Sequence, residues 1–124
     1  MDTPPDLYIS VYRELISEKY DGCTQIFTDG SKQGSAVAAA AVVIDKVLVQ
    51  RLPDHASIFS AEAQAILLAL DIISQSSNQG FVILSDSLSC VEAIKNRHLQ
   101  NPLIVKILER LHKQLRCDCS ITFV

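Results

Sequence analysis

The sequence predicts a single domain of the mixed α/β class, and three observations support this prediction. Residues 24–28, 36–44 and 47–52 resemble three successive strands, joined by connections short enough to favour antiparallel pairing. From residue 57 onward, apolar residues recur at helical spacing instead. Helical and strand-like segments then follow one another to the end, which is typical of a sheet with helical crossovers.

The first 23 residues are expected to form a linker and a helix that precede the main domain, which we place at residues 24–124. Asp6 can cap this helix, and the apolar residues Leu7, Val11 and Leu15 follow at nearly helical spacing.

The next three segments predict the first part of the sheet. Residues 24–28 have the β-branched and aromatic content of a strand, which we expect to end at the turn-forming segment 29–31. Residues 36–44 are rich in alanine and valine, and we expect a central strand that is buried on both faces. Residues 47–52 return as its hairpin partner.

A long helix is predicted over residues 57–74, where apolar residues share one face. The apolar run 81–84 suits a buried parallel strand. Ser89 and Glu92 fit a capping box for a helix that reaches Arg97.

Asn101 and Pro102 predict the start of a further helix, with an N-cap followed by proline at the first helical position. Its expected buried stripe is Ile104, Ile107, Leu108, Leu111 and Leu115, and its expected exposed basic stripe is Lys106, Arg110, Lys113 and Arg116. Residues 120–124 predict a last strand.

Composition places the chain among soluble globular proteins, because 48% of its residues are hydrophobic and 20% are charged. The sequence contains no apolar run long enough for a membrane span and no signal-like start, so we expect an intracellular protein. The four cysteines lack the spacing of a zinc site, and reduced, mostly buried thiols are expected.

The charges are unevenly distributed along the chain. Residues 1–86 contain five Lys/Arg against eleven Asp/Glu, a net of −6, whereas residues 87–124 contain six against three, a net of +3. This division fits a metal site beside a phosphate-binding face, or simply two solvated surfaces.

Three acids are the candidates for chemistry. Asp29 and Asp86 each follow a predicted strand, and Glu62 lies in an alanine-rich helix turn that should face the sheet. Converging carboxylates repel one another, and a divalent cation keeps them ionised; an all-oxygen set suits Mg²⁺ or Mn²⁺. Taken singly, each acid has an ordinary explanation, namely a turn, a helix cap or a salt bridge.

Together, three segments resemble the ordered motifs of type I ribonuclease H: FTDGSK at 27–32, SAEAQAI at 60–66 and LSDS at 84–87. They look most like the ribonuclease H domains of insect-type non-LTR retrotransposon reverse transcriptase polyproteins. The resemblance covers residues 24–124. It implies a ribonuclease H-like fold, with a five-stranded mixed sheet, the first three strands antiparallel, flanked by helices.

The resemblance also implies metal-dependent hydrolysis of the RNA strand of RNA–DNA hybrids. Asp29 would bridge two Mg²⁺ or Mn²⁺ ions, and Glu62 and Asp86 would complete the site for one of them. The residues implied for contact with sugar and phosphate are Gly30, Ser31, Lys32 and Ser87.

The sequence departs from the family at two places. Type I enzymes continue past the last strand with a histidine loop and a helix that carries a fourth acid. This sequence ends at Val124, so we expect a missing final helix, an impaired metal site and weak or lost activity. Ile58 and Phe59 stand where cellular enzymes have polar residues that touch the hybrid.

Other functions follow from these departures. The alternative to an enzyme is a non-catalytic module that binds nucleic acid or protein, and a homodimer through the exposed edge of the last strand is conceivable. Retroviral-type aspartic proteases are excluded because Asp29 is followed by glycine and then serine, the reverse of their order. Actin-like ATPases need a far longer chain.

Overall fold

The computed structural model describes residues 24–43, 46–76, 80–85, 87–115 and 120–123. Its strands are β1 (Thr24–Gln33), β2 (Ala36–Val43), β3 (Lys46–Leu52), β4 (Gly80–Ser85) and β5 (Ser120–Phe123). Its helices are α2 (Ile58–Ser74), α3 (Leu88–Lys95) and α4 (Pro102–Leu115). The predicted linker and helix at 1–23, and with them the domain boundary at residue 23, lie outside the described residues.

The described strands form one mixed sheet in the order β3-β2-β1-β4-β5. β1 pairs with β2, and β2 with β3, in antiparallel fashion, whereas β1–β4 and β4–β5 are parallel pairs. The predicted mixed α/β sheet with three antiparallel strands at its start is therefore confirmed.

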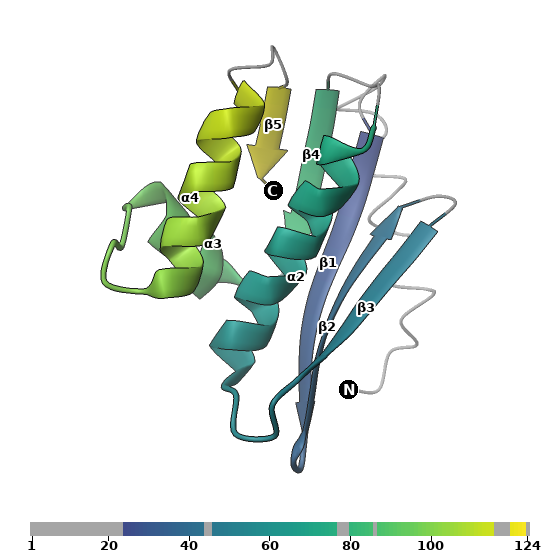
Figure 1. Cartoon of the computed structure of the whole chain (residues 1–124), viewed down its shortest axis with the longest axis vertical. Helices are drawn as coiled ribbons and strands as arrows, with labels where there is room; N and C mark the ends of the chain where they lie inside the picture. The colour runs from purple at the N-terminus through teal and green to yellow at the C-terminus, as the bar shows by residue number, and fades with distance from the viewer. Residues whose placement is uncertain (1–23, 44–45, 77–79, 86, 116–119, 124) are drawn as a thin grey trace.

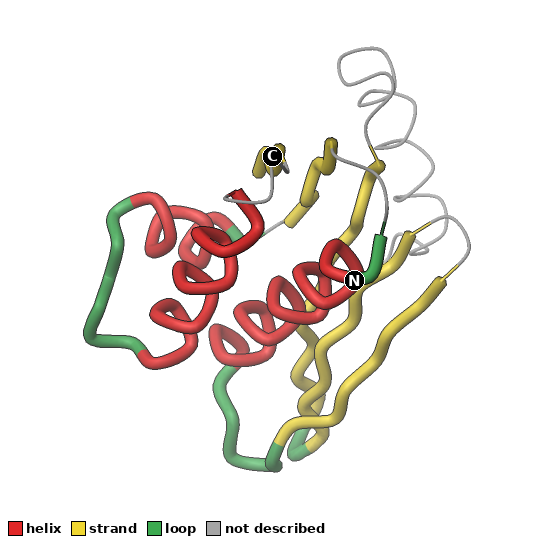
Figure 2. The backbone as a smooth tube through the Cα atoms, turned by 45° about the horizontal axis from the view of Figure 1, so that its top comes forward, coloured by secondary structure: helices red, strands yellow, loops and turns green. Residues whose placement is uncertain are grey.

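The three described helices lie on one face of this sheet (Figures 1 and 2). α2 packs across β1 and β2, and α4 packs beside α2, where Arg110 forms an ion pair with Asp71. The core lies between these layers, and its largest fully buried aliphatic and aromatic side chains include Ile26, Ile66, Leu70, Phe81, Ile83, Ile104 and Ile107.

β1 does not end at residue 28, and the predicted turn at 29–31 is wrong. The strand continues to Gln33, with Asp29, Gly30 and Ser31 paired with the alanines 38–40 of β2. The turn falls at residues 34–35 instead, where Gly34 has a φ of 61°, a conformation that favours glycine. The partner strand has overridden the local turn propensity.

Two further predictions need correction. β2 is buried on one face and only half-buried on the other, because the described helices cover one side of the sheet. α3 is capped by Ser87 rather than Ser89, since the Ser87 hydroxyl oxygen accepts a hydrogen bond from the Cys90 amide at 3.3 Å. The N-cap at Asn101 is confirmed, with its side-chain oxygen accepting from the Leu103 amide at 2.9 Å.

β5 lies at one edge of the sheet, and the homodimer through this edge stays a prediction. Among the described helices, none is both long and apolar enough to cross a membrane.

The core predicts that truncating a buried leucine lowers the free energy of unfolding far more than truncating an exposed leucine. Leu70 of α2 is fully buried, so Leu70→Ala should lower the free energy of unfolding in urea by about 3 kcal/mol through lost transfer energy and a cavity. Leu99 is 68% exposed, and Leu99→Ala should stay within about 0.5 kcal/mol of the wild type. Equal effects at the two positions would contradict this core.

Candidate functional site

Asp29 lies within β1, at the point beyond which the strand still pairs with β2 but no longer with β4. Its residue partner on β2 is Ala40. On the other side, the described ladder between β1 and β4 ends with Thr28 opposite Ser85. The parallel pairing of β1 with β4 therefore brings Ser85 beside Thr28, the residue before Asp29.

Gly30 brings the backbone of β1 against the first turns of α2. A Cβ atom at Gly30 would lie 2.5 Å from the Glu62 amide nitrogen and 2.7 Å from the Ala61 carbonyl carbon. Real Cβ atoms essentially never come so close to backbone, so only glycine permits this approach. The same position is 2.8 Å from the Glu62 Cγ. The half-buried Glu62 side chain thus packs against β1 at Gly30, the residue that follows Asp29.

Thr28, the residue before Asp29, joins β1 to β4. Its buried hydroxyl donates a hydrogen bond to the Leu84 carbonyl oxygen at 3.2 Å. Asp86 itself lies outside the described residues, so the structure describes two of the three predicted acids: Asp29 in β1 and Glu62 in α2, where the Glu62 backbone approaches Gly30, the residue after Asp29.

Hydrogen bonds surround position 86 along the chain. The Ser87 amide donates to the Ser85 hydroxyl oxygen at 3.1 Å, and Ser87, only 4% exposed, caps α3. Cys90, in the first turn of α3, donates its thiol hydrogen to the Phe59 carbonyl oxygen of α2, with a sulfur–oxygen distance of 3.6 Å. Ser85, Ser87 and Cys90 are therefore all held by hydrogen bonds.

Burial raises the pKa of the Cys90 thiol; the hydrogen bond with Ser87 opposes this rise, and the negative charge of Glu62 adds to it. The Glu62 carboxylate therefore acts electrostatically on the first turn of α3. Cys90 is a free, buried thiol, as predicted, while Cys23, Cys117 and Cys119 lie outside the described residues.

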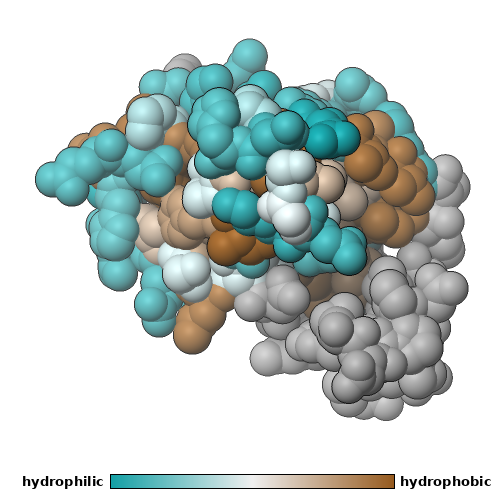
Figure 3. Space-filling model, turned by 90° about the horizontal axis from the view of Figure 1, so that it is seen from below, coloured by the Kyte–Doolittle hydropathy of each residue, from teal (hydrophilic) through white to brown (hydrophobic). Residues whose placement is uncertain are grey.

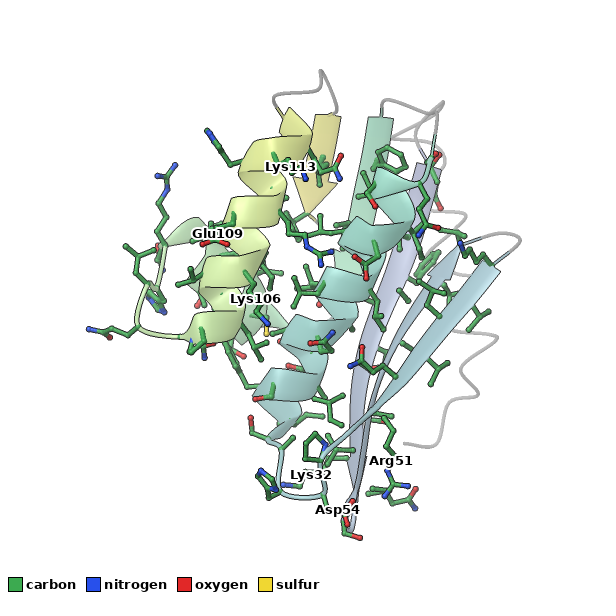
Figure 4. The ribbon with its side chains drawn as sticks, viewed as in Figure 1. Lys32, Arg51, Asp54, Lys106, Glu109 and Lys113 are labelled. Carbon is green, nitrogen blue, oxygen red and sulfur yellow. The ribbon has the colours of Figure 1, made fainter. Side chains whose placement is uncertain are left out.

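The residues predicted to contact substrate differ in exposure, since Ser31 and Lys32 are exposed whereas Ser87 is buried. Ser31 and Lys32 are exposed on the part of β1 that extends beyond β4. Figure 4 shows Lys32 at the lower end of the molecule, near Arg51 and Asp54, which form a salt bridge at 3.0 Å. Figure 3 views the molecule from this end and shows polar side chains interspersed with apolar ones.

The residues present fit a hard divalent cation. Asp29 and Glu62 offer carboxylate oxygens, the donors that Mg²⁺ and Mn²⁺ prefer, and Glu62 packs against Gly30, the residue after Asp29. Within the described ranges, no group of three His, Cys, Asp or Glu side chains could hold a metal ion. The predicted third ligand, Asp86, is not within those ranges.

Sequence reasoning did not identify Thr28 or Cys90 as parts of this site. Each acts through a carbonyl oxygen distant in sequence, 56 residues away for Thr28 and 31 for Cys90. The sequence contains no local signal for either bond.

A sheet of this order with α2 packed against β1 is a ribonuclease H-like fold. The structure is similar to ribonuclease H1 from the halophilic archaeon Halobacterium salinarum, with a TM-score of 0.63 and 20% sequence identity, covering 83% of this chain and 86% of that chain. The chain belongs to the family described as Reverse transcriptase-like, whose model matches residues 19–124. No curated protein matches it. The chain thus resembles ribonuclease H family endonucleases.

The close contact at Gly30 predicts that even one added methyl group will disturb the site. Gly30→Ala should lower the free energy of unfolding by about 1–3 kcal/mol through overpacking. It should also weaken Mn²⁺ binding by about tenfold, because Glu62 is displaced. Urea unfolding and Mn²⁺ titration by calorimetry measure the two effects.

Gly34→Ala is the matched control. A Cβ atom there would meet nothing within 4 Å, but the φ of 61° strains it, so a loss of about 1 kcal/mol with unchanged Mn²⁺ affinity is expected. If both alanines alter Mn²⁺ affinity equally, the contact at Gly30 does not shape the site.

Proposed function

We propose that this chain is a metal-dependent endonuclease that hydrolyses the RNA strand of RNA–DNA hybrids, with Asp29, Glu62 and Asp86 as its metal ligands. The observation that carries the proposal is the contact of Gly30, the residue after Asp29, with the α2 backbone at Glu62. Membership of the Reverse transcriptase-like family and the ribonuclease H1-like fold support it.

In this proposal Asp29, Glu62 and Asp86 hold Mg²⁺ or Mn²⁺ as ionised carboxylates. The bound metal supplies Lewis-acid stabilisation of phosphate oxygens and a water of lowered pKa. The protein supplies position: the Thr28–Leu84 bond fixes β1 against β4, and the Ser87–Ser85 bond fixes the residues on either side of Asp86.

The exposed residues Ser31 and Lys32 are suited to contact the sugar–phosphate backbone, together with the Gly30 amide. Lys32 brings a positive charge to the exposed part of β1 that extends beyond β4. Recognition through 2′-hydroxyls and phosphates would be independent of base sequence. Ser87 differs, because its buried hydroxyl already caps α3, and we assign it to holding Asp86 in place.

A second function, protein binding without catalysis, is favoured by the edge strand β3. Val47 and Val49 are 60% and 68% exposed there. Exposed valines on a sheet edge are the kind of surface that pairs with another chain.

The proposed function predicts how amide substitutions change hybrid cleavage. Asp29→Asn and Glu62→Gln should each lower the rate of cleavage of an end-labelled RNA strand, in a hybrid with Mn²⁺, by at least about 100-fold, because each removes a ligand charge. EDTA should abolish the wild-type reaction.

Glu109→Gln is the control for these variants. It makes the same chemical change on the exposed surface of α4 (Figure 4) and should leave the rate unchanged. Cleavage that persists undiminished in Asp29→Asn would refute the proposed function. Hybrid binding without any cleavage by the wild type would indicate the non-catalytic alternative.

A further inference from the structure

The edge strand β3 lacks several of the features that usually protect the edge of a sheet. It lies at the end of the strand order, with β5 at the other end (Figure 1). All of its residues pair one to one with β2, so residues 46–52 contain no bulge, and none of them is proline. Natural edge strands are often very short, bulged or interrupted by proline, which keeps other chains from pairing with them. The regular strand β3 is therefore open to a further strand.

The exposed valines of β3 lie on the sheet face that points away from the described helices. Leu48 pairs with Ala41 of β2, and both pack into the hydrophobic core with α2. Since successive side chains of a strand point to opposite faces, Val47 and Val49 project on the other face, where they are 60% and 68% exposed. β3 thus presents two β-branched apolar side chains on a strand that has only one neighbour in the described sheet.

The cationic side chains of β3 are held by contacts within the same chain. The Lys46 Nζ donates a hydrogen bond to the Gln75 Oε1 at the end of α2, at 3.2 Å. Arg51 forms its salt bridge with Asp54, the residue two positions after the strand ends. Lysine and arginine on an edge strand discourage pairing with another chain, but here both are drawn onto partners of their own chain.

The sequence of β3 is complementary to itself in one antiparallel register. When two copies meet about Leu48, Val47 of each copy lies opposite Val49 of the other. Lys46 then lies opposite Gln50, so the cation faces a neutral residue rather than a like charge. Centring the pair on Val49 instead would leave each Val47 opposite a charged residue. The match of apolar with apolar side chains favours the register about Leu48.

We infer that a second copy of this chain pairs with β3 in antiparallel fashion about Leu48 and forms a two-fold symmetric dimer with one continuous sheet. Such a contact uses the same surface on both copies and closes after two. One strand from each copy should bury less than the about 1,200 Å² of a standard interface, so we expect reversible association with a dissociation constant on the order of 10 μM. The inference does not rest on the proposed function, because none of the proposed metal ligands lies in β3.

Sedimentation equilibrium under reducing conditions tests the dimer. The wild type should pass from monomer to dimer between about 1 and 300 μM. Val49→Lys should weaken dimerisation by at least about tenfold, because the new charge would lie opposite the partner's Val47. Leu99→Lys is the matched control: it adds the same charge at a residue that is also 68% exposed but lies outside the sheet, and it should leave dimerisation unchanged.

Cysteine cross-linking tests the register. Residues directly opposite each other on paired strands have Cα atoms close enough for a disulfide, whereas diagonal neighbours are farther apart. A mixture of Val47→Cys and Val49→Cys should therefore give disulfide-linked dimers under a mild oxidant. Either variant alone should give no more than the wild type.

The outcomes separate the dimer from other uses of this edge. A wild type that stays monomeric over the whole range overturns the inference and leaves the edge to a strand of a different protein. A dimer that Val49→Lys does not weaken also overturns it, because the contact then lies elsewhere. Cross-linking of a single variant as strong as that of the mixture overturns the register about Leu48. The cleavage of hybrids tests the proposed function separately.

Discussion

The contact between the backbones of β1 and α2 at Gly30 is the constraint on which the rest of the structure depends. It requires small residues on both sides, and the sequence supplies them: the buried alanines of α2 and β2 are Ala39, Ala41, Ala61, Ala63, Ala65 and Ala69. With these short side chains the helix lies close to the strands, while larger residues such as Ile66 and Leu70 fill the space farther along. The positions of residues at this contact are therefore set by backbone packing rather than by long, flexible side chains.

The element types were predictable because hydrophobic spacing reports them directly. α2 and α4 appear in the sequence as apolar residues at helical spacing, α4 with a recognisable N-cap at Asn101, and β4 as a short apolar run. The failures share a cause. Residues 29–31 have turn propensity, yet pairing with β2 extends β1 through them, and no local signal encodes the partner. The one-sided burial of β2 likewise depends on where the helices pack, which periodicity alone does not reveal.

Only part of the candidate site could be predicted from the sequence. Motif resemblance selected Asp29 and Glu62, and the structure packs Gly30, the residue after Asp29, against the Glu62 backbone. The supports of the site were not predictable, because Thr28 and Cys90 act on carbonyl oxygens of segments that are neighbours only in the folded chain. A threonine before an aspartate and a cysteine in a helix have many ordinary roles. Their importance follows from packing, which is the level that sequence patterns describe least well.

These supports also bear on how a cluster of acids can be held together at all. Carboxylates repel one another until a cation binds, so the apo protein needs forces that do not depend on the charges. The three observed supports are of that kind: a backbone contact at Gly30, a neutral hydroxyl bond from Thr28 and a neutral thiol bond from Cys90. Since none of the three involves a net charge, salt does not screen them. On the proposed function, the metal would therefore enter a site whose elements are already in position, and less of its binding free energy would be used to order them.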